Sequence, residues 1–443
     1  MTAYWCEYAW LPSGLVASVR VDVTGDRIVG VSADVEAKPD DVRLAGVTLP
    51  GLANTHSHAF HRALRGRTHG GGGTFWTWRE RMYAVASRLD PARYLALARA
   101  AYAEMALAGY TAVGEFHYVH HQPDGTPYAD PNAMGAALIQ AAAEAGVRLT
   151  LLNTIYLTGG LGPDGHLPLD VVQQRFSDGS VSAWASRVGR LTDTSMTRMG
   201  AAIHSVRAVP REVLADVVTA AGGRPLHVHL SEQPAENRAC LAYYGVTPTE
   251  LLEAAGALGP QTSVVHATHL STDDISSLAL AGVTACFCPT TERDLADGIG
   301  PARALADAGA RLALGSDQHA VVDPFEEARG LESHERLVTL ERGRFTPDQL
   351  TDALSRNGYA ALGWPDGGRL AAGALADFVT VRLDSPRTAG ASPEQIVYAA
   401  TGSDVTTVVV GGQPVVSDGR HRLGDIGRLL ADAVSELDDE GVS

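Results

Sequence analysis

Short apolar segments alternate with longer, helix-like segments through the middle of the chain. Residues 90–109 begin with an Asp-Pro pair, as many helices do, and end at Gly109 directly before the apolar segment 111–116. The same order of helix, glycine and strand recurs at 131–152, 210–230 and 271–287. Further apolar segments of strand length lie at 48–55, 201–204, 263–266 and 311–315, which makes eight predicted strands. Strands and helices that alternate in this way predict a (β/α)8 TIM barrel.

The two ends of the chain have a different pattern, with strands but few helices. Four stretches read as strands, and they lie at residues 15–21, 27–31, 376–381 and 406–415. The last of these contains a Gly-Gly turn and resembles a hairpin. We therefore predict a small β-sandwich domain built from both chain ends. Its expected parts are residues 1–48 and 368–443, the second ending in a helix, with the barrel at 49–367.

The composition is that of an ordinary soluble globular protein, with a formal net charge of -16 over 443 residues. An acidic chain without a basic stripe argues against nucleic acid or an anionic membrane surface as a partner. The four cysteines have neither metal-knuckle nor disulfide-framework spacing, which fits a reducing compartment. Because we also find no signal-peptide pattern and no run of about 18 apolar residues, we expect a cytoplasmic protein.

Two histidines one residue apart, His56 and His58, directly follow an apolar strand. In extended backbone, residues i and i+2 point to the same side, so both imidazoles can reach one ion. Three other predicted strands also end in residue types that bind metals, namely His229, His266 and Asp317. We expect His56, His58, His229 and Asp317 to hold a divalent ion and to leave one position for water.

The chain contains a single lysine, Lys38, which lies in a polar turn before the first barrel strand. Many barrel hydrolases with two metal ions bridge them with a carboxylated lysine. Because Lys38 cannot play that part, the sequence predicts one ion per chain.

Two further residues at strand ends are candidates for catalysis. Glu232 follows His229 by three residues and can shuttle a proton between water and a leaving nitrogen. The alternative is that Glu232 is only a carboxylate at a helix N-terminus. We expect His266 to orient the nucleophile and to stabilise the tetrahedral intermediate. Among the other histidines, we expect His269 to be a loop residue and His227 a packed core or outer-shell residue.

Arginines and a tyrosine supply candidates for binding the substrate. Arg207 stands at the end of the fourth strand and Arg79 lies in an aromatic segment, and a guanidinium matches a carboxylate with two hydrogen bonds. Tyr118 is a candidate hydrogen-bond donor. Three histidines near it, His117, His120 and His121, suggest a second metal site, which we disfavour because Glu115 is the only nearby carboxylate.

Taken together, these residues resemble the amidohydrolase superfamily and, within it, the formimidoylglutamate deiminases of histidine degradation. The resemblance covers nearly the whole chain. It is most specific at the stretches 56–63, 75–80, 109–121, 204–207, 265–269 and 315–317. It implies one zinc ion on His56, His58, His229 and Asp317, with Glu232 and His266 catalytic. It also implies that the substrate contacts fall on Arg79, Tyr118, His204, Arg207 and the position of His61. The chain departs from the family pattern there, since that pattern has glutamine where His61 stands.

The resemblance implies hydrolysis of N-formimidoyl-L-glutamate to N-formyl-L-glutamate and ammonia. Separately, we expect the chain to form a homodimer. The ion would make water nucleophilic, Asp317 or Glu232 would accept its proton, and Glu232 would protonate the leaving nitrogen. Two alternatives remain open. One is a related deaminase of a heterocycle such as guanine, which an aromatic and neutral pocket would favour. The other is a metal-free barrel that acts as a scaffold, which the presence of all four ligands disfavours.

Overall fold

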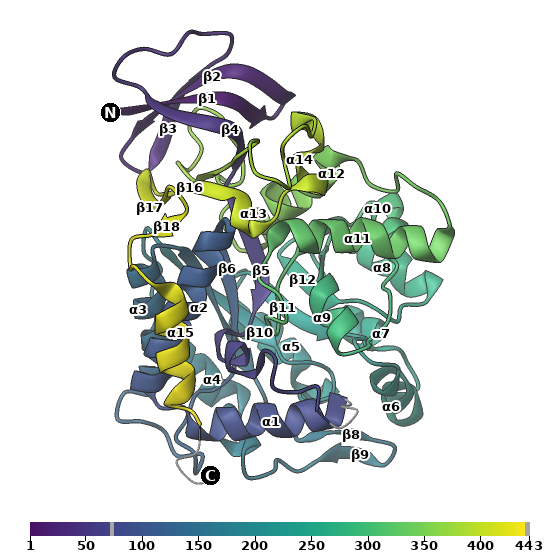
Figure 1. The fold of residues 1–443 in the computed structure, drawn as a ribbon. Coiled ribbons are helices and arrows are strands. Elements are labelled where there is room, and N and C mark those ends of the chain that lie inside the picture. The colour runs from purple at the N-terminus through teal and green to yellow at the C-terminus, as the bar shows by residue number, and fades with distance from the viewer. Residues whose placement is uncertain (71–74, 439–443) are drawn as a thin grey trace.

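The computed structural model describes residues 1–70 and 75–438, which form a barrel with a smaller β domain at one end (Figure 1). The barrel strands are β5 (Leu52–Ser57), β6 (Tyr110–His117), β7 (Arg148–Ile155), β10 (Thr197–Ile203), β11 (Leu226–Leu230), β12 (Thr262–His266), β13 (Thr284–Phe287) and β14 (Arg311–Leu314). They are hydrogen-bonded in the order β14-β13-β12-β11-β10-β7-β6-β5, and neighbouring strands are parallel. A parallel bridge between Ser57 and Asp317 joins the two outer strands. The predicted TIM barrel is confirmed.

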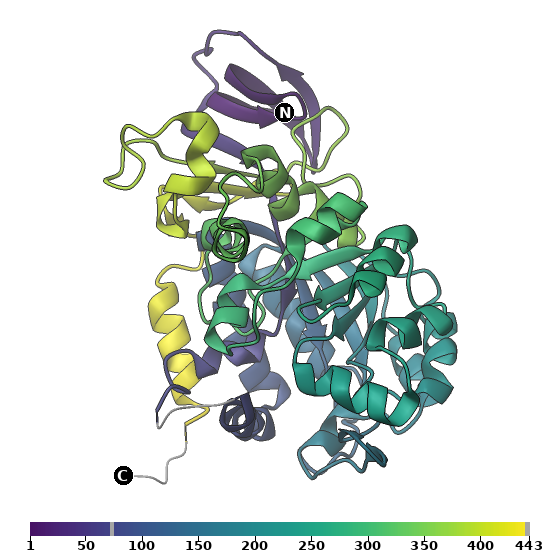
Figure 2. The same ribbon diagram turned by 90° about the vertical axis from the view of Figure 1, so that its right-hand side faces the viewer.

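Helices connect the barrel strands and cover the outside of the barrel (Figures 1 and 2). The α-helices are α1 (Phe75–Arg88), α2 (Pro91–Ala108), α3 (Ala133–Ala145), α4 (Val181–Val188), α5 (Arg211–Ala221), α6 (Pro234–Tyr244), α7 (Pro248–Ala254), α8 (Thr272–Ala281), α9 (Pro289–Asp294), α10 (Ala302–Ala308), α11 (Pro324–Thr339), α12 (Pro347–Leu354), α13 (Arg356–Ala361), α14 (Ile396–Ala399) and α15 (Ile426–Ser435). The 3-10 helices are η1 (Ala59–Leu64), η2 (Gln173–Phe176), η3 (Pro393–Gln395) and η4 (Gly402–Asp404).

The predicted limits of helix α2 agree with the structure, and local chemistry explains both ends. The Asp90 side chain accepts a hydrogen bond from the Arg93 N–H at the first turn, and Pro91 stands at the first helical position. Gly109 ends the helix with φ of 109°, a left-handed conformation that favours glycine. The chain then enters strand β6, which ends at the site.

The sheet of this smaller domain, called the small sheet below, joins the two ends of the chain, as predicted. Its strands are β1 (Thr2–Leu11), β2 (Gly14–Thr24), β3 (Arg27–Ser32), β4 (Val42–Pro50), β15 (Phe378–Val381), β16 (Val405–Val410), β17 (Gln413–Ser417) and β18 (Arg420–His421). They form one continuous sheet in the order β18-β17-β16-β15-β4-β1-β2-β3, in which β15 pairs antiparallel with β4. Its core contains residues from both ends, among them Tyr4, Val21 and Phe378.

A buried ion pair fixes this sheet to the barrel. Asp377, just before β15, accepts hydrogen bonds from Arg148 Nε at 2.6 Å and from the Tyr359 hydroxyl at 2.8 Å. Its other oxygen accepts the Gly411 N–H at 2.7 Å. The side chains of Arg148 and Asp377 are fully buried, so this charge pair is well satisfied by hydrogen bonds. Arg148 begins barrel strand β7, and Asp377 therefore ties the C-terminal segment to the barrel.

The prediction of one strand at 48–55 is wrong in one respect, because these residues belong to two strands that lie in different sheets. Strand β4 ends at Pro50 in the small sheet, and β5 begins at Leu52 in the barrel. At Gly51 a Cβ would lie 2.6 Å from Thr111 Oγ1, so the turn between the sheets needs a glycine. The prediction also missed strand β1 and the hairpin of β8 (Gly160–Gly162) and β9 (Gly165–Leu167).

Within the described residues, none of the helices has the length and apolar character needed to cross a membrane.

Candidate active site

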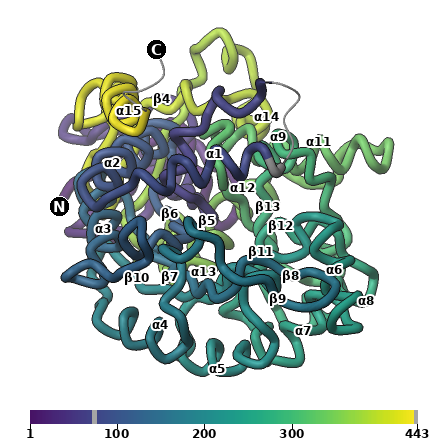
Figure 3. Tube along the Cα trace, turned by 90° about the horizontal axis from the view of Figure 1, so that it is seen from below, coloured from purple at the N-terminus to yellow at the C-terminus, as the bar shows by residue number. Residues whose placement is uncertain are grey.

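The predicted site residues gather at the carboxyl ends of the barrel strands, the end seen from below in Figure 3. They surround a cavity that opens to solvent. The residues that line it include His58, His61, Trp78, Arg79, Tyr83, Tyr118, Tyr156, Phe176, His204, Arg207, His229, Glu232, His266 and Asp317. The β8–β9 hairpin contributes Gly160 to the wall. This placement is where TIM barrels carry their chemistry.

Four of the predicted site residues, namely His56, His58, His229 and Asp317, form a tight group of metal-ligand type. Asp317 Oδ1 lies 3.2 Å from His56 Nε2 and 3.3 Å from His58 Nε2. His229 Nε2 lies 3.1 Å from His56 Nε2. All four residues are buried. The structure thus brings together the ligand set predicted from the sequence, with His266 close enough to join His56, His229 and Asp317.

Hydrogen bonds at the Nδ1 atoms of His58 and His229 fix the orientation of these rings, so that their Nε2 atoms face the centre of the metal-ligand group. His58 Nδ1 lies 2.9 Å from the Phe116 carbonyl oxygen, and His229 Nδ1 lies 2.9 Å from that of His204. A carbonyl oxygen only accepts, so both Nδ1 atoms carry the proton and both Nε2 atoms present lone pairs. Lone pairs that converge beside a carboxylate fit a bound cation, and second-sphere carbonyls of this kind hold metal-binding histidines in place.

The charge states of the group also suit a metal. Burial lowers the pKa of His56 to about 3 and holds the pKa of His229 well below its usual range. Burial alone would raise the pKa of Asp317, but the neighbouring imidazole rings of His56 and His58 hold it well below its ordinary value. Neutral imidazoles and an ionised carboxylate are the forms that bind a divalent ion.

The backbone adopts left-handed conformations at three strand ends in the site. Ser231, His266 and Asp317 have φ of 50°, 68° and 41°. Residues other than glycine rarely adopt this region, and each costs on the order of 1–3 kcal/mol. Strain of this kind is held where the surrounding structure fixes it, and here it aims the strand-end side chains into the cavity.

Glu232 stands between two of the predicted site residues. Its Oε2 atom accepts a hydrogen bond from Arg207 Nη2 at 3.2 Å, and its Oε1 atom lies 3.8 Å from His266 Nε2. Gln233, not Glu232, is the N-cap residue of helix α6. The carboxylate of Glu232 therefore faces the cavity, as a proton shuttle requires.

His266 lies between two carboxylates. Burial by itself would lower the pKa of this histidine, but the neighbouring carboxylates of Glu232 and Glu292 raise it to about 10. A cationic imidazole at this place can stabilise the negative charge that develops when a nucleophile attacks.

The five predicted substrate contacts all line the cavity. His61 Nε2 lies 3.0 Å from the Tyr118 hydroxyl, and Arg79 Nε donates to the Tyr83 hydroxyl at 2.8 Å. Arg207 also has its Nε atom 3.3 Å from Glu236, a fully buried carboxylate. Sequence reasoning missed Glu236, Tyr156 and Glu292. The four-residue spacing from Glu232 to Glu236 was the available signal for the first of them.

The remaining histidines have structural partners. His120 Nδ1 lies 3.3 Å from His117 Nε2, and His121 forms an ion pair with Asp178 at 3.2 Å. None of the candidate metal clusters within residues 1–70 and 75–438 includes them, in line with the disfavoured second site. His227 is buried with Nε2 3.2 Å from the Ala361 carbonyl, and His269 bonds the carbonyl of Asp297 in a loop. The sequence predicted both roles.

Several known proteins are similar to this chain in sequence and in fold. A model of the amidohydrolase family matches residues 47–415. The formimidoylglutamate deiminase of Pseudomonas aeruginosa is 38% identical over 442 residues, which cover 95% of this chain and 96% of that protein. A solved amidohydrolase from Brucella melitensis has a TM-score of 0.92 and 34% identity, covering 99% of this chain and 100% of its own. Atrazine chlorohydrolase from Arthrobacter aurescens, solved in complex with zinc, has a TM-score of 0.85 at 22% identity over 99% of this chain and 100% of its own, which shows the fold alone.

Proposed function

The chain belongs to the amidohydrolase family, and from this premise we propose that it hydrolyses N-formimidoyl-L-glutamate to N-formyl-L-glutamate and ammonia. One observation carries the choice of substrate. A single cavity is lined by His58, His229 and Asp317 of the metal-ligand group, by the Glu232 and His266 pair, and by Arg79 and Arg207. A substrate with a hydrolysable formimino group and two carboxylates matches that combination.

Zinc is the ion that we propose for the site, one per chain. Three histidine nitrogens and one carboxylate oxygen are a common donor set for it. When bound there, a divalent ion supplies Lewis acidity and makes water nucleophilic near neutral pH.

The chain's own residues carry the protons of the reaction. Glu232 or Asp317 accepts a proton as water attacks the formimino carbon, and the carbon becomes tetrahedral. Glu232 then delivers a proton to the nitrogen that leaves as ammonia, and the C–N bond breaks. His266 faces Glu232 across 3.8 Å and stabilises the charge of the tetrahedral intermediate. The other nitrogen stays on the glutamate part, so the product is the N-formyl compound.

Substrate turnover tests the proposal directly. Ammonia release is measured with N-formimidoyl-L-glutamate, with a neutral formamidine and with a panel of heterocyclic amines that includes guanine. We expect kcat/KM to be highest for N-formimidoyl-L-glutamate, because Arg79 and Arg207 hold its carboxylates. Preferred turnover of guanine would instead favour a heterocycle deaminase. The aromatic side chains of the cavity wall, Tyr118, Tyr156 and Phe176, would then contact the heterocycle.

Metal analysis of carefully washed protein is expected to give one ion per chain. The converging donors form one compact group in the described residues, because His58, His61 and Asp317 share two members with the predicted ligand set. Lys38 lies in the loop before β4 and cannot bridge two ions. Two equivalents retained together with full activity would contradict a mononuclear site.

We also propose a cytoplasmic location and a homodimeric state, without nucleic acid or membrane as a partner. The acidic composition supports the absence of a nucleic-acid partner. Sedimentation of the purified protein tests the oligomeric state.

A further inference from the structure

The imidazole of His266 has a carboxylate on each side. Its Nε2 atom faces Glu232 at 3.8 Å and the cavity. Its Nδ1 atom faces Oε1 of Glu292 at 3.5 Å. The proposed reaction uses Glu232, but it assigns nothing to Glu292.

Glu292 is held firmly where it lies. The residue is only 2% exposed and belongs to α9, the short helix that follows strand β13 directly. Its Oε1 atom, the one nearest His266, accepts a hydrogen bond from the Cys288 N–H at 2.8 Å. The backbone carbonyl of Glu292 in turn accepts the Asp297 N–H at 2.9 Å. Both ends of the residue are therefore anchored, and its carboxylate forms a fixed support behind the histidine.

We propose that Glu292 is a positioning residue for the hydrolytic reaction: it orients His266 from behind, so that Nδ1 carries a proton and Nε2 is directed at the reacting centre. The proposal rests on the proposed role of His266. A carboxylate beside one ring nitrogen fixes the orientation of an active-site histidine ring. The backbone of His266 is left-handed and therefore strained, so a contact that holds the imidazole ring in place is needed there.

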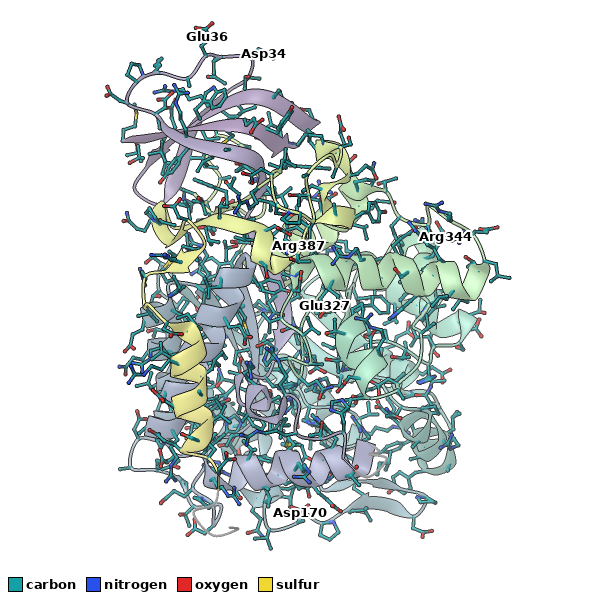
Figure 4. All side chains as sticks on the ribbon, viewed as in Figure 1. Asp34, Glu36, Asp170, Glu327, Arg344 and Arg387 are labelled. Carbon is teal, nitrogen blue, oxygen red and sulfur yellow. The ribbon has the colours of Figure 1, made fainter. Side chains whose placement is uncertain are left out.

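A second buried carboxylate provides a matched control. Glu327, labelled in Figure 4, extends from α11 to the start of the same helix α9. It accepts hydrogen bonds from the Thr290 N–H at 3.0 Å and the Thr290 hydroxyl at 2.5 Å. Glu292 and Glu327 are thus both buried and both bond the beginning of α9. Of the two, Glu292 is the one in contact with His266.

The test compares Glu292→Gln with Glu327→Gln. Glutamine keeps an oxygen for the Cys288 N–H but is a weaker acceptor than a carboxylate for the histidine proton. We expect Glu292→Gln to lower kcat by about 10- to 100-fold, with KM and bound metal close to those of the wild type. Glu327→Gln is expected to lower the melting temperature but to keep kcat within a few-fold. Loss of kcat in Glu327→Gln equal to that in Glu292→Gln, or no loss in either, overturns the proposal.

A second variant and the choice of substrate allow the role of Glu292 to be tested even if Glu292→Gln does not fold or the substrate is a different one. If Glu292→Gln does not fold, Glu292→Asp keeps the charge but withdraws it from Nδ1, and it should still lower kcat relative to Glu327→Gln. The kcat of each variant relative to the wild type is measured on whichever substrate the wild type turns over best. Failure to hydrolyse N-formimidoyl-L-glutamate would therefore contradict the proposed function without deciding the role of Glu292.

Discussion

Replacement of Glu232 by glutamine is expected to lower kcat by about 10²- to 10⁴-fold while the metal stays bound. Glutamine preserves the shape of the side chain, and its carbonyl oxygen can still accept the hydrogen bond from Arg207 that now reaches Oε2. It cannot take a proton from water or deliver one to a leaving nitrogen. Because Glu232 is not among the residues of the candidate metal clusters, its loss should leave the ion in place.

Steady-state kinetics and elemental analysis of the same sample measure this effect. Glu250→Gln is a suitable control, since Glu250 belongs to the capping box of α7 and its Oε2 accepts the Thr247 N–H at 2.6 Å. That variant should retain wild-type kcat. If Glu232→Gln holds its metal and works within a few-fold of the wild type, Glu232 has a structural role and another residue moves the proton.

The candidate metal ligands could be predicted because their signals are local. His56 and His58 alternate on one strand, and His229 and Asp317 each end another apolar strand. In a parallel barrel the carboxyl ends of all strands meet at one face. Once the sequence predicted eight alternating strands, it also predicted that these residues lie together. The structure brings these residues together, and His56 Nε2 lies 3.2 Å from Asp317 Oδ1.

The partners of these residues could not be predicted in the same way. Glu292 lies on a helix after the seventh barrel strand, and nothing in its sequence neighbourhood shows that it reaches back to His266 on the sixth. Arg148 and Asp377 are 229 residues apart, yet they form the buried pair that joins the sheet to the barrel. Such contacts depend on how the helices and the small sheet pack. Periodicity and strand ends carry no information on that packing.

The break at Gly51 has a similar cause. Residues 48–55 include several apolar positions in a stretch of strand length, which fits one strand as well as two. Close packing against Thr111 and the hydrogen bond of the Gly51 N–H to Asp377 decide that the chain changes sheets there. Both partners are distant in sequence.

Replacement of Arg207 by alanine is expected to lower kcat/KM for N-formimidoyl-L-glutamate by about 30-fold or more. Loss of one partner from a buried charge pair costs roughly 2–5 kcal/mol, much of it from the charge left unpaired. The structure adds a second effect, because Arg207 also contacts Glu232 at 3.2 Å and Glu236 at 3.3 Å. Part of the loss should therefore appear with every substrate, as the proton shuttle loses its neighbour.

The ratio between two substrates separates these effects. A neutral formamidine reports the disturbance of Glu232, since it offers no carboxylate to Arg207. We expect Arg207→Ala to reduce turnover of the dicarboxylate substrate far more than turnover of this analogue, because a guanidinium binds a carboxylate with strict geometry. Arg79→Gln, from the same cavity wall, should show the same preference with a smaller shared loss. Equal losses on both substrates in Arg207→Ala would mean that this arginine serves to hold Glu232 and Glu236, and carboxylate recognition would then depend on Arg79.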